Sequence, residues 1–290
     1  MDVHLVDGTF ELFRAYYGAP PSKTKDGLEV GATRAFIRSM LSLIKEPNVT
    51  HIGVAFDHVI ESFRNDLFPG YKTGEGIEQP LASQFPLVEE ASRALGLVTW
   101  PMVEFEADDM LASAAVKFAS DPKVKRVIIC SPDKDLTQVI DGKKIFCYDR
   151  IRRKMMDYNK VIEKFGIEPQ SIPDYLGLVG DSADGIPGIP RWGAKSSMAI
   201  LSKFKTIDKI PENEENWGIK VRGASTLAQN LREQKQEAEL YKKLATLRLD
   251  VPITESLNDL AWEGGNKSLA ENFLPTISGE RLLAQISRWR

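Results

Sequence analysis

The first half of the chain contains short runs that are apolar at nearly every position. Val3 to Val6, His51 to Phe56, Leu97 to Trp100, Val127 to Cys130 and Ile145 to Tyr148 are such runs. Continuous apolar runs of this length are typical of strands that are buried on both faces of a sheet. The pattern therefore predicts a sheet whose strands are spread over the first half of the chain.

Between these runs, apolar residues recur at the spacing of a helix, which predicts helices over 29–45, 85–95 and 106–118. Strands that alternate with helices favour an α/β fold in which helices cover both faces of a mainly parallel sheet. After residue 173 the strand signals fade, and helical spacing covers 175–179, 194–204 and 226–247. The sequence thus predicts an α/β domain over 1–168, a helical subdomain over 169–255, and a C-terminal extension over 256–290 without an assigned role.

Acids follow several of the predicted strands. Asp7 and Asp57 come directly after the first two strands, and Asp133 and Asp135 follow the run that ends at Cys130. Parallel strands bring their carboxyl ends to one edge of a sheet, where ligands bind. An extended backbone would also point Asp133 and Asp135 to the same side. For Asp7 an ordinary Asp-Gly turn is the alternative.

Further acids open two other segments. Glu106, Asp108 and Asp109 begin a predicted helix, where they could also simply complement the helix dipole. Asp181 and Asp184 are three residues apart, which places both on one side of a helix or turn. So many neighbouring carboxylates would repel each other without a cation, and hard divalent cations prefer oxygen ligands. The acids therefore predict a site for two Mg²⁺ ions about 4 Å apart, with Mn²⁺ as a substitute.

A basic, glycine-rich segment lies between two predicted helices. Residues 180–195 read GDSADGIPGIPRWGAK, and from Gly185 to Ile207 all the charged side chains are basic. Exposed amides and a helix N-terminus can bind phosphate without any contact to a base. The segment favours a clamp for the phosphate backbone, and a solvated basic connection between helices is the alternative. The candidate DNA-binding residues are Gly185, Gly188, Arg191, Gly193, Lys195, Ser196 and Lys203.

Composition narrows the class of protein. The chain has 290 residues, 42% of them hydrophobic and 27% charged, as expected of a globular protein, and its net charge is −3. No run of about 18 apolar residues is present, so no membrane span or membrane partner is expected. The N-terminus does not read as an export signal, and we expect Cys130 and Cys147 to be buried, reduced thiols.

The motifs VDG, AFD, FEADD, SPDKD and GDSADGIPG occur in this order. Their order resembles the 5′-nuclease superfamily, specifically the 5′→3′ exonuclease and flap endonuclease domain that precedes bacterial DNA polymerase I and also occurs as a standalone protein. The resemblance covers roughly residues 3–250. It implies an Mg²⁺-dependent DNA nuclease of the PIN/5′-nuclease fold that acts on 5′ flaps, overhangs or ends and leaves 5′-phosphate and 3′-hydroxyl products.

The resemblance also implies roles for individual residues. It divides the acids into a first metal cluster, Asp7, Asp57, Glu106, Asp108 and Asp109, and a second, Asp133, Asp135, Asp181 and Asp184. It places a helix-three-turn-helix, with a K⁺ ion, on residues 180–204. It matches Arg14, Arg64, Tyr71 and Lys72 to positions that approach the scissile phosphate and the neighbouring bases. We expect a monomer in the cytoplasm at the nucleoid, or in an organelle if a transit peptide was removed.

One departure from the family and two rival hypotheses shape this interpretation. Where relatives carry an arginine in the helical arch, this chain has Gly74-Glu75-Gly76, so its arch is expected to differ. A phosphatase of the haloacid dehalogenase type would need a nucleophilic aspartate two residues before Asp7, where Leu5 stands. A non-catalytic protein that binds DNA structures through the same fold is the other alternative.

Overall fold

The computed structural model describes residues 1–290 and divides into two compact units. The first unit consists of residues 1–60, 74–131 and 249–290, and the second consists of residues 61–73 and 132–248. Each unit is therefore assembled from segments that are far apart in the chain. The division of the sequence at residues 168 and 255 stays a prediction.

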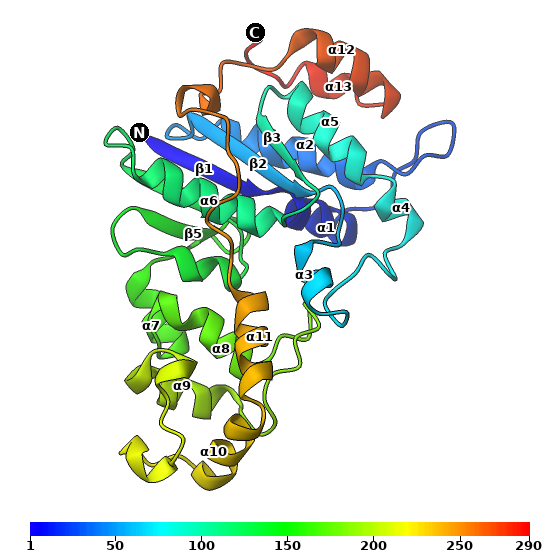
Figure 1. Ribbon diagram of the computed structural model, residues 1–290. Coiled ribbons are helices and arrows are strands. Elements are labelled where there is room, and N and C mark those ends of the chain that lie inside the picture. Colours follow the sequence, from blue (N-terminus) through cyan, green and yellow to red (C-terminus); the bar gives the residue numbers. More distant parts are fainter. The chain divides into compact units, whose positions relative to one another are not determined.

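The first unit is built on a parallel sheet (Figure 1). Its strands are β1 (Asp2–Asp7), β2 (His51–Asp57), β3 (Val98–Met102) and β4 (Arg126–Cys130). Their order across the sheet is β3-β2-β1-β4, and each neighbouring pair is parallel. Every residue of β1 is buried, as expected of a strand that is covered on both faces. The parallel sheet that the apolar runs predict is confirmed.

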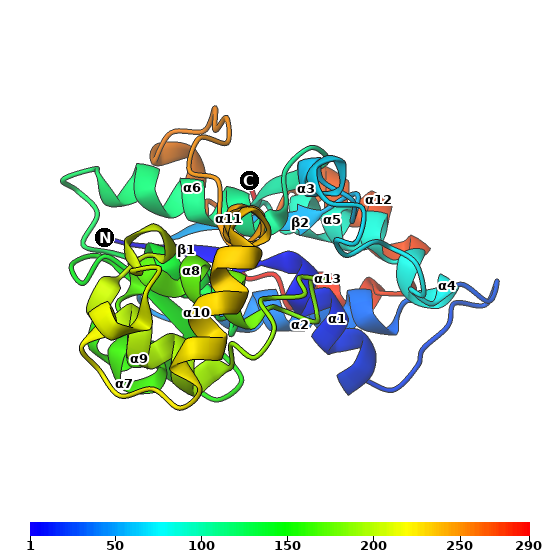
Figure 2. The same ribbon diagram turned by 60° about the horizontal axis from the view of Figure 1, so that its bottom comes forward.

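Helices cover both faces of this sheet. Figure 2 shows α6 (Ala107–Ala119) on one face, and α1 (Gly8–Gly18) and α2 (Gly31–Ile44) on the other. On the second face Phe36 of α2 packs against Phe56 of β2, with ring centroids 5.7 Å apart. The other helices of the first unit that precede β3 are α4 (Gln79–Ala82) and α5 (Phe85–Ala94).

The C-terminal extension belongs to the first unit. It contains a 3₁₀ turn (Asn258–Leu260), α12 (Lys267–Thr276) and α13 (Glu280–Leu283). The indole N–H of Trp262 donates to the carbonyl of Leu95 at 2.9 Å, and Phe273 and Leu274 are buried. The extension thus contributes to the hydrophobic core of this unit.

The second unit is mainly helical. Its helices are α3 (Phe63–Leu67), α7 (Tyr158–Phe165), α8 (Ile172–Val179), α9 (Ala194–Phe204), α10 (Ala224–Glu233) and α11 (Lys235–Ala245). It also contains 3₁₀ turns at Asp135–Val139, Pro169–Ser171, Ile207–Lys209 and Glu214–Trp217. Strands β5 (Ile145–Asp149) and β6 (Lys154–Met156) form an antiparallel hairpin.

One sequence prediction for the second unit was wrong in detail. The single helix expected over 226–247 is divided at Gln234, whose φ of −119° and ψ of 37° are not helical, so its apolar residues lie on two helices.

Two further expectations were tested by the structure. Cys130 and Cys147 are free and buried, as predicted. No helix combines the length and the apolar composition that crossing a membrane requires.

Candidate active site

The first acid cluster begins at the carboxyl ends of β1 and β2. Asp7 is buried, and its carboxylate accepts hydrogen bonds from the amide of Phe10 at 2.8 Å and the hydroxyl of Ser131 at 2.9 Å. It therefore serves as the N-cap of α1 instead of opening an Asp-Gly turn. The amide of Asp57 donates to the hydroxyl of Thr9, which lies in the first turn of α1. This contact joins the ends of the two strands.

The N-terminus of α6 adds the other acids of this cluster. The carboxylate of Asp57 accepts a hydrogen bond from the amide of Ala107 at 2.8 Å, so the first residue of α6 lies against the end of β2. Glu106 is the N-cap of α6 and is buried. The carboxylate of Asp109 accepts from the amide of Glu106 at 3.0 Å in a capping box. The first unit thus places Asp7 and Asp57 at the carboxyl ends of β1 and β2, and Glu106, Asp108 and Asp109 at the start of α6. That these five acids share a metal ion stays a prediction.

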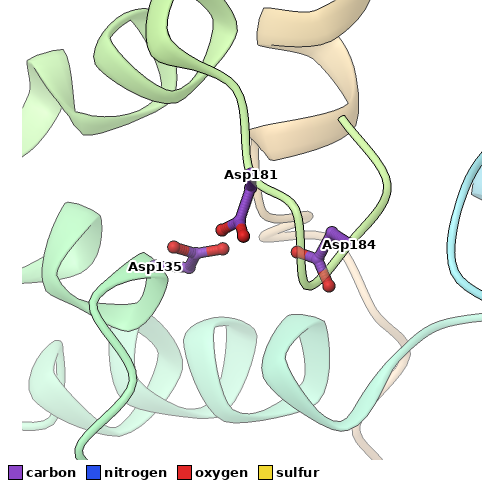
Figure 3. A group of neighbouring side chains, drawn as sticks. All are labelled: Asp135, Asp181 and Asp184. Atoms are coloured by element: carbon purple, nitrogen blue, oxygen red, sulfur yellow. The ribbon is translucent and has the colours of Figure 1, made fainter. Parts of the chain in front are cut away.

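The second acid cluster lies within the second unit. The carboxylate oxygens of Asp135, Asp181 and Asp184 lie within 4.8 Å of one another. Figure 3 shows that Asp135 projects from the segment after residue 131, whereas Asp181 and Asp184 come from the loop after α8. That loop is tight, because the amides and carbonyls of Asp181 and Ile186 exchange two hydrogen bonds of 2.8 Å. The spacing of three residues therefore places both acids on one side of a turn.

Asp133 and Asp135 are close for a different reason than the sequence suggested. Asp135 begins a 3₁₀ turn, and the backbone of Lys134 is already helical, so the expected extended conformation was wrong. The carboxylate of Asp133 instead accepts the amide of Asp135 at 2.9 Å. Asp133 is exposed, whereas Asp135 is only 8% exposed. The turn orders one acid at the surface and buries the other.

Two lysines contact the second cluster. Lys72 Nζ lies 3.1 Å from Asp184 Oδ1, and Lys134 Nζ lies 3.2 Å from Asp135 Oδ1 and also contacts Asp181. Burial by itself would lower the pKa of Lys134, but the carboxylates of Asp135 and Asp181 outweigh it and raise that pKa. No role was predicted for Lys134 from the sequence, although its place between two acids in SPDKD was an available signal.

The second cluster favours a bound cation. Burial and then the charge of Asp133 raise the pKa of Asp135 to about 8, even though Lys134 opposes the shift. Asp135 Oδ1 has no hydrogen-bond donor, and its contact with Lys134 at 3.2 Å is an ion pair of poor geometry. A divalent cation would offset the free-energy cost of burying the charged carboxylate of Asp135 and would also reduce its repulsion with Asp133. The oxygen-only donor set fits Mg²⁺ or Mn²⁺.

The structure gives Arg64 and Tyr71 positions that do not support direct contact with substrate. Arg64 is 1% exposed, and its guanidinium donates to the carbonyls of Leu244 at 2.7 Å and Thr246 at 3.1 Å. Tyr71 is 4% exposed, and Lys72 Nζ lies 5.6 Å from its ring centroid. In this conformation Arg64 is hydrogen-bonded to the end of α11, and the ring of Tyr71 packs against Lys72.

Arg14, on α1 in the first unit, is held by its neighbours. Its guanidinium forms an ion pair with Glu11, which is buried, and donates to the hydroxyl of Ser39 at 3.1 Å. Its side chain is 33% exposed, so part of it reaches the surface. A role in substrate binding stays a prediction for Arg14.

The glycine-rich segment has structural requirements of its own. Gly185 and Gly188 have φ values of +73° and +72°, in the left-handed region that favours glycine. A Cβ atom at Gly185 would lie 2.2 Å from the carbonyl oxygen of Gly70. Packing therefore explains these two glycines, and their contact with DNA stays a prediction.

The basic residues of the same segment differ from each other. Arg191, Lys195 and Gly193 are exposed, and Ser196 is half-buried, at the start of α9. Lys203, in contrast, donates from Nζ to the carbonyl of Trp217 at 2.5 Å. The start of α9 is therefore the better candidate for binding an anion, and Lys203 connects α9 to the loop that follows it.

Comparison with known proteins agrees with the motifs. Residues 2–166 match the family of the 5′-3′ exonuclease N-terminal resolvase-like domain, and residues 167–268 match the 5′-3′ exonuclease C-terminal SAM fold. The chain belongs to the 5′-3′ exonuclease family. The resemblance drawn from the motifs is confirmed.

Individual relatives cover the chain almost completely. A 5′-3′ exonuclease of Aquifex aeolicus is 31% identical over 99% of this chain and 95% of its own length. DNA polymerase I of Rhizobium leguminosarum is 33% identical over 98% of this chain, but the match spans only 28% of that polymerase. The chain therefore corresponds to less than a third of that polymerase.

Solved structures share the fold. A T5 5′-exonuclease with bound zinc superposes with a TM-score of 0.68 at 18% identity, over 98% of this chain and 99% of that one. The catalytic core of Rad2 in complex with a DNA substrate superposes with a TM-score of 0.61 at 13% identity, over 98% of this chain and 90% of that one. The predicted fold class is confirmed.

Proposed function

We propose that this 5′-3′ exonuclease family member is a Mg²⁺-dependent DNA 5′-nuclease. It hydrolyses phosphodiesters near junctions between single strand and duplex, acts as a monomer, and leaves 5′-phosphate and 3′-hydroxyl ends. The observation that carries the proposal is the group of Asp135, Asp181 and Asp184, whose carboxylate oxygens lie within 4.8 Å of one another. The T5 and Rad2 relatives with metal ions or DNA support the same conclusion.

The acids of both clusters would hold two divalent cations. When bound, these cations lower the pKa of an attacking water and neutralise charge on the phosphate. A bound cation would also offset the burial and the charge of Asp133, which together raise the pKa of Asp135, and would thereby favour the ionised carboxylate.

Lys72 has a positioning role beside these acids. Its Nζ lies 3.1 Å from Asp184, and its amide donates to the carbonyl of Asp184 at 3.0 Å. The side chain is 29% exposed, so the ammonium can leave the carboxylate and contact a phosphate. The chain thereby places a cation where negative charge increases during phosphoryl transfer.

The glycine-rich segment before α9 would bind the duplex backbone, together with K⁺. Its basic residues support a contact that does not depend on sequence. An increase of duplex affinity in KCl relative to LiCl at equal ionic strength would support the K⁺ site. Equal affinities would argue against it.

A cleavage assay tests the proposed function directly. The substrate is a duplex with a 5′ flap, labelled at each end in separate reactions, incubated with Mg²⁺, Mn²⁺, Ca²⁺ or EDTA. We expect cleavage near the junction with Mg²⁺ and Mn²⁺, and none with EDTA. Specific binding of the flap without cleavage in any metal would instead identify a non-catalytic DNA-binding protein.

A further inference from the structure

The C-terminal end of α11 is hydrogen-bonded to side chains from two other segments of the second unit. The last carbonyls of a helix have no partner within the helix, so buried ones need partners from elsewhere. The carbonyls of Leu244 and Thr246 accept from Arg64. The carbonyl of Ala245, between them, accepts from Nε2 of Gln138 at 3.1 Å. Arg64 and Gln138 therefore both cap the end of this helix.

Gln138 uses its whole side-chain amide in this arrangement. Besides donating to Ala245, its Oε1 accepts from the amide of Leu247, just beyond α11, at 3.0 Å. Its Nε2 also donates to the carbonyl of Asp135 at 2.8 Å. Two bonds to successive parts of one backbone leave the amide little freedom to rotate. The third bond attaches the 3₁₀ turn that begins at Asp135 to the end of α11.

This attachment concerns an acid of the second cluster. Asp135 is 8% exposed, and its Oδ1 has no hydrogen-bond donor. The position of the carboxylate therefore depends strongly on the backbone that carries it. Leu136 and Thr137, the next two residues of the turn, are buried, so the turn itself is packed into the unit.

The segment that carries the other two acids is packed against the same helix. α8 lies along α11 (Figure 1) and ends at Val179, two residues before Asp181. A Cβ atom at Gly177 of α8 would lie 2.8 Å from the amide nitrogen of Lys242, so the two backbones are in close contact. Nζ of Lys242 also lies 2.8 Å from Asp174 of α8, which is 1% exposed. α11 thus supports both segments that form the cluster.

We propose that Gln138 is a positioning residue of the second acid cluster, because it attaches the turn of Asp135 to the helix against which the segment of Asp181 and Asp184 is packed. It acts through the backbone of Asp135 and not as a ligand. Residues that orient the ligands of a metal ion contribute to its affinity in this way. The inference rests on the proposed function as to the cation, whereas the attachment is a property of the chain alone.

Gln138→Met tests the attachment, because methionine has nearly the same length and forms none of the three bonds. Amide hydrogen exchange, followed by NMR in EDTA, reports on the turn without metal or DNA. The amides of Asp135 and Thr137 should exchange about tenfold or more faster than in the original chain, measured relative to the amides of α7.

Trp217→Phe is the matched control. The indole of Trp217 is fully buried and donates to the carbonyl of Pro211 at 2.8 Å, so this variant also loses a hydrogen bond from a side chain to the backbone of the second unit. It should lower the Tm without changing the relative exchange of Asp135 and Thr137. The control therefore separates a general loss of stability from a loosened turn.

Calorimetric titration with Mn²⁺ in the absence of DNA measures the consequence for the acids. The binding component that is lost in Asp135→Asn identifies the second cluster. Gln138→Met should weaken this component about tenfold or more and leave any other component unchanged, as expected when a group that orients a ligand is removed. Trp217→Phe should weaken neither.

The two measurements together decide the inference. Unchanged relative exchange of Asp135 and Thr137 in Gln138→Met overturns it, whether or not the chain cleaves DNA. Faster exchange with an unchanged affinity of the second cluster also overturns it, because the attachment would then not affect the acids. Faster exchange with a selectively weakened component supports it. If the original chain binds no Mn²⁺, the proposed function fails, and faster exchange still shows that Gln138 positions Asp135.

Discussion

The two acid clusters are held in different ways. In the first unit, the carboxylates of Asp7 and Asp57 accept hydrogen bonds from backbone amides and a hydroxyl at the ends of strands and the start of a helix. In the second unit, Asp181 and Asp184 contact the ammonium groups of Lys134 and Lys72. One cluster is ordered by the regular secondary structure around it, and the other by turns and by the chain's own cations.

This difference has a consequence for metal binding. Fixed neutral donors orient the carboxylates of Asp7 and Asp57. A cation that binds to the second cluster must displace or rearrange the ammonium groups of Lys72 and Lys134. We therefore expect Mg²⁺ binding to the second cluster to be sensitive to the loss of these lysines. Substitutions in the two clusters should separate these properties.

The largest effect is expected from Asp57→Asn in the first cluster. Asparagine retains an oxygen that can accept from Ala107, so the fold should persist, but the negative charge that holds a cation is lost. A metal ion contributes several kcal/mol to catalysis, so single-turnover cleavage of a 5′-flap duplex should slow by about 100-fold or more. Affinity for the same DNA in EDTA should remain unchanged.

Glu104→Gln is the matched control for this substitution. Glu104 is exposed just before α6 and lies outside both clusters. Its variant should cleave at the original rate. If Asp57→Asn also cleaves at the original rate with saturating Mg²⁺, Asp57 does not hold a catalytic metal ion.

In the absence of metal, the buried carboxylate of Asp135 in the second cluster should lower the stability of the folded chain at high pH. The pKa of Asp135 is raised to about 8 in the folded chain, from an ordinary value near 3.8. Because the folded state then holds a proton that the unfolded state has released, stability should fall as the pH rises from about 4 to about 8. Asp135→Asn removes this loss, so its Tm in EDTA at pH 8.5 should exceed that of the original chain by about 2–4 °C or more.

Asp133→Asn provides the comparison, because Asp133 belongs to the same cluster but is exposed. Its Tm should change less than that of Asp135→Asn at pH 8.5, and the two variants should differ little at pH 5. Saturating Mg²⁺ should reverse the order by stabilising only the chain with intact ligands. A Tm of Asp135→Asn that is lower than the original at pH 8.5 in EDTA would show that the buried charge is well compensated.

The contrast between the clusters also explains what could be predicted from the sequence. Apolar runs that end in Asp7 and Asp57 predict both the parallel strands and the place of their acids, because strand direction alone brings these ends together. The capping box at Glu106 and Asp109 likewise follows from local spacing. For this cluster, local pattern and tertiary position agree.

The second cluster depends on contacts that local pattern does not contain. Lys72 reaches Asp184 across more than a hundred residues of sequence, and no periodicity indicates that pairing. Arg64 lies next to Tyr71 and Lys72 in the family's motif, yet the fold buries it against the carbonyls after α11. Such roles become visible only when distant segments are placed side by side.

Lys72→Ala should sharpen the comparison with a smaller effect. Loss of the ammonium beside Asp184 should reduce the single-turnover rate at least about tenfold, since a positioned charge stabilises the transition state. It should also lower the Mg²⁺ concentration that gives half of the maximal rate, because a competing cation is gone. Lys25→Ala, in an exposed loop of the first unit, is the control. A variant that retains the original rate would place Lys72 outside the active site.

The smallest effect concerns Glu75, where the chain departs from its relatives. Residues 68–78 form no helix, and Gly76 has a φ of +86°, so backbone conformation and glycine entropy both oppose a rigid arch here. Glu75 is exposed, and it is an anion where the resemblance to the family implies a cation. Glu75→Arg should therefore strengthen binding of duplexes with long 5′ single strands several-fold, with weaker effects on short flaps.

Glu75→Gln should give an intermediate affinity if charge is responsible. Single-turnover rates at saturating enzyme should not change, because the substitution affects how the strand is held before the chemical step. Equal affinities of all variants for long flaps would show that the strand does not pass this loop.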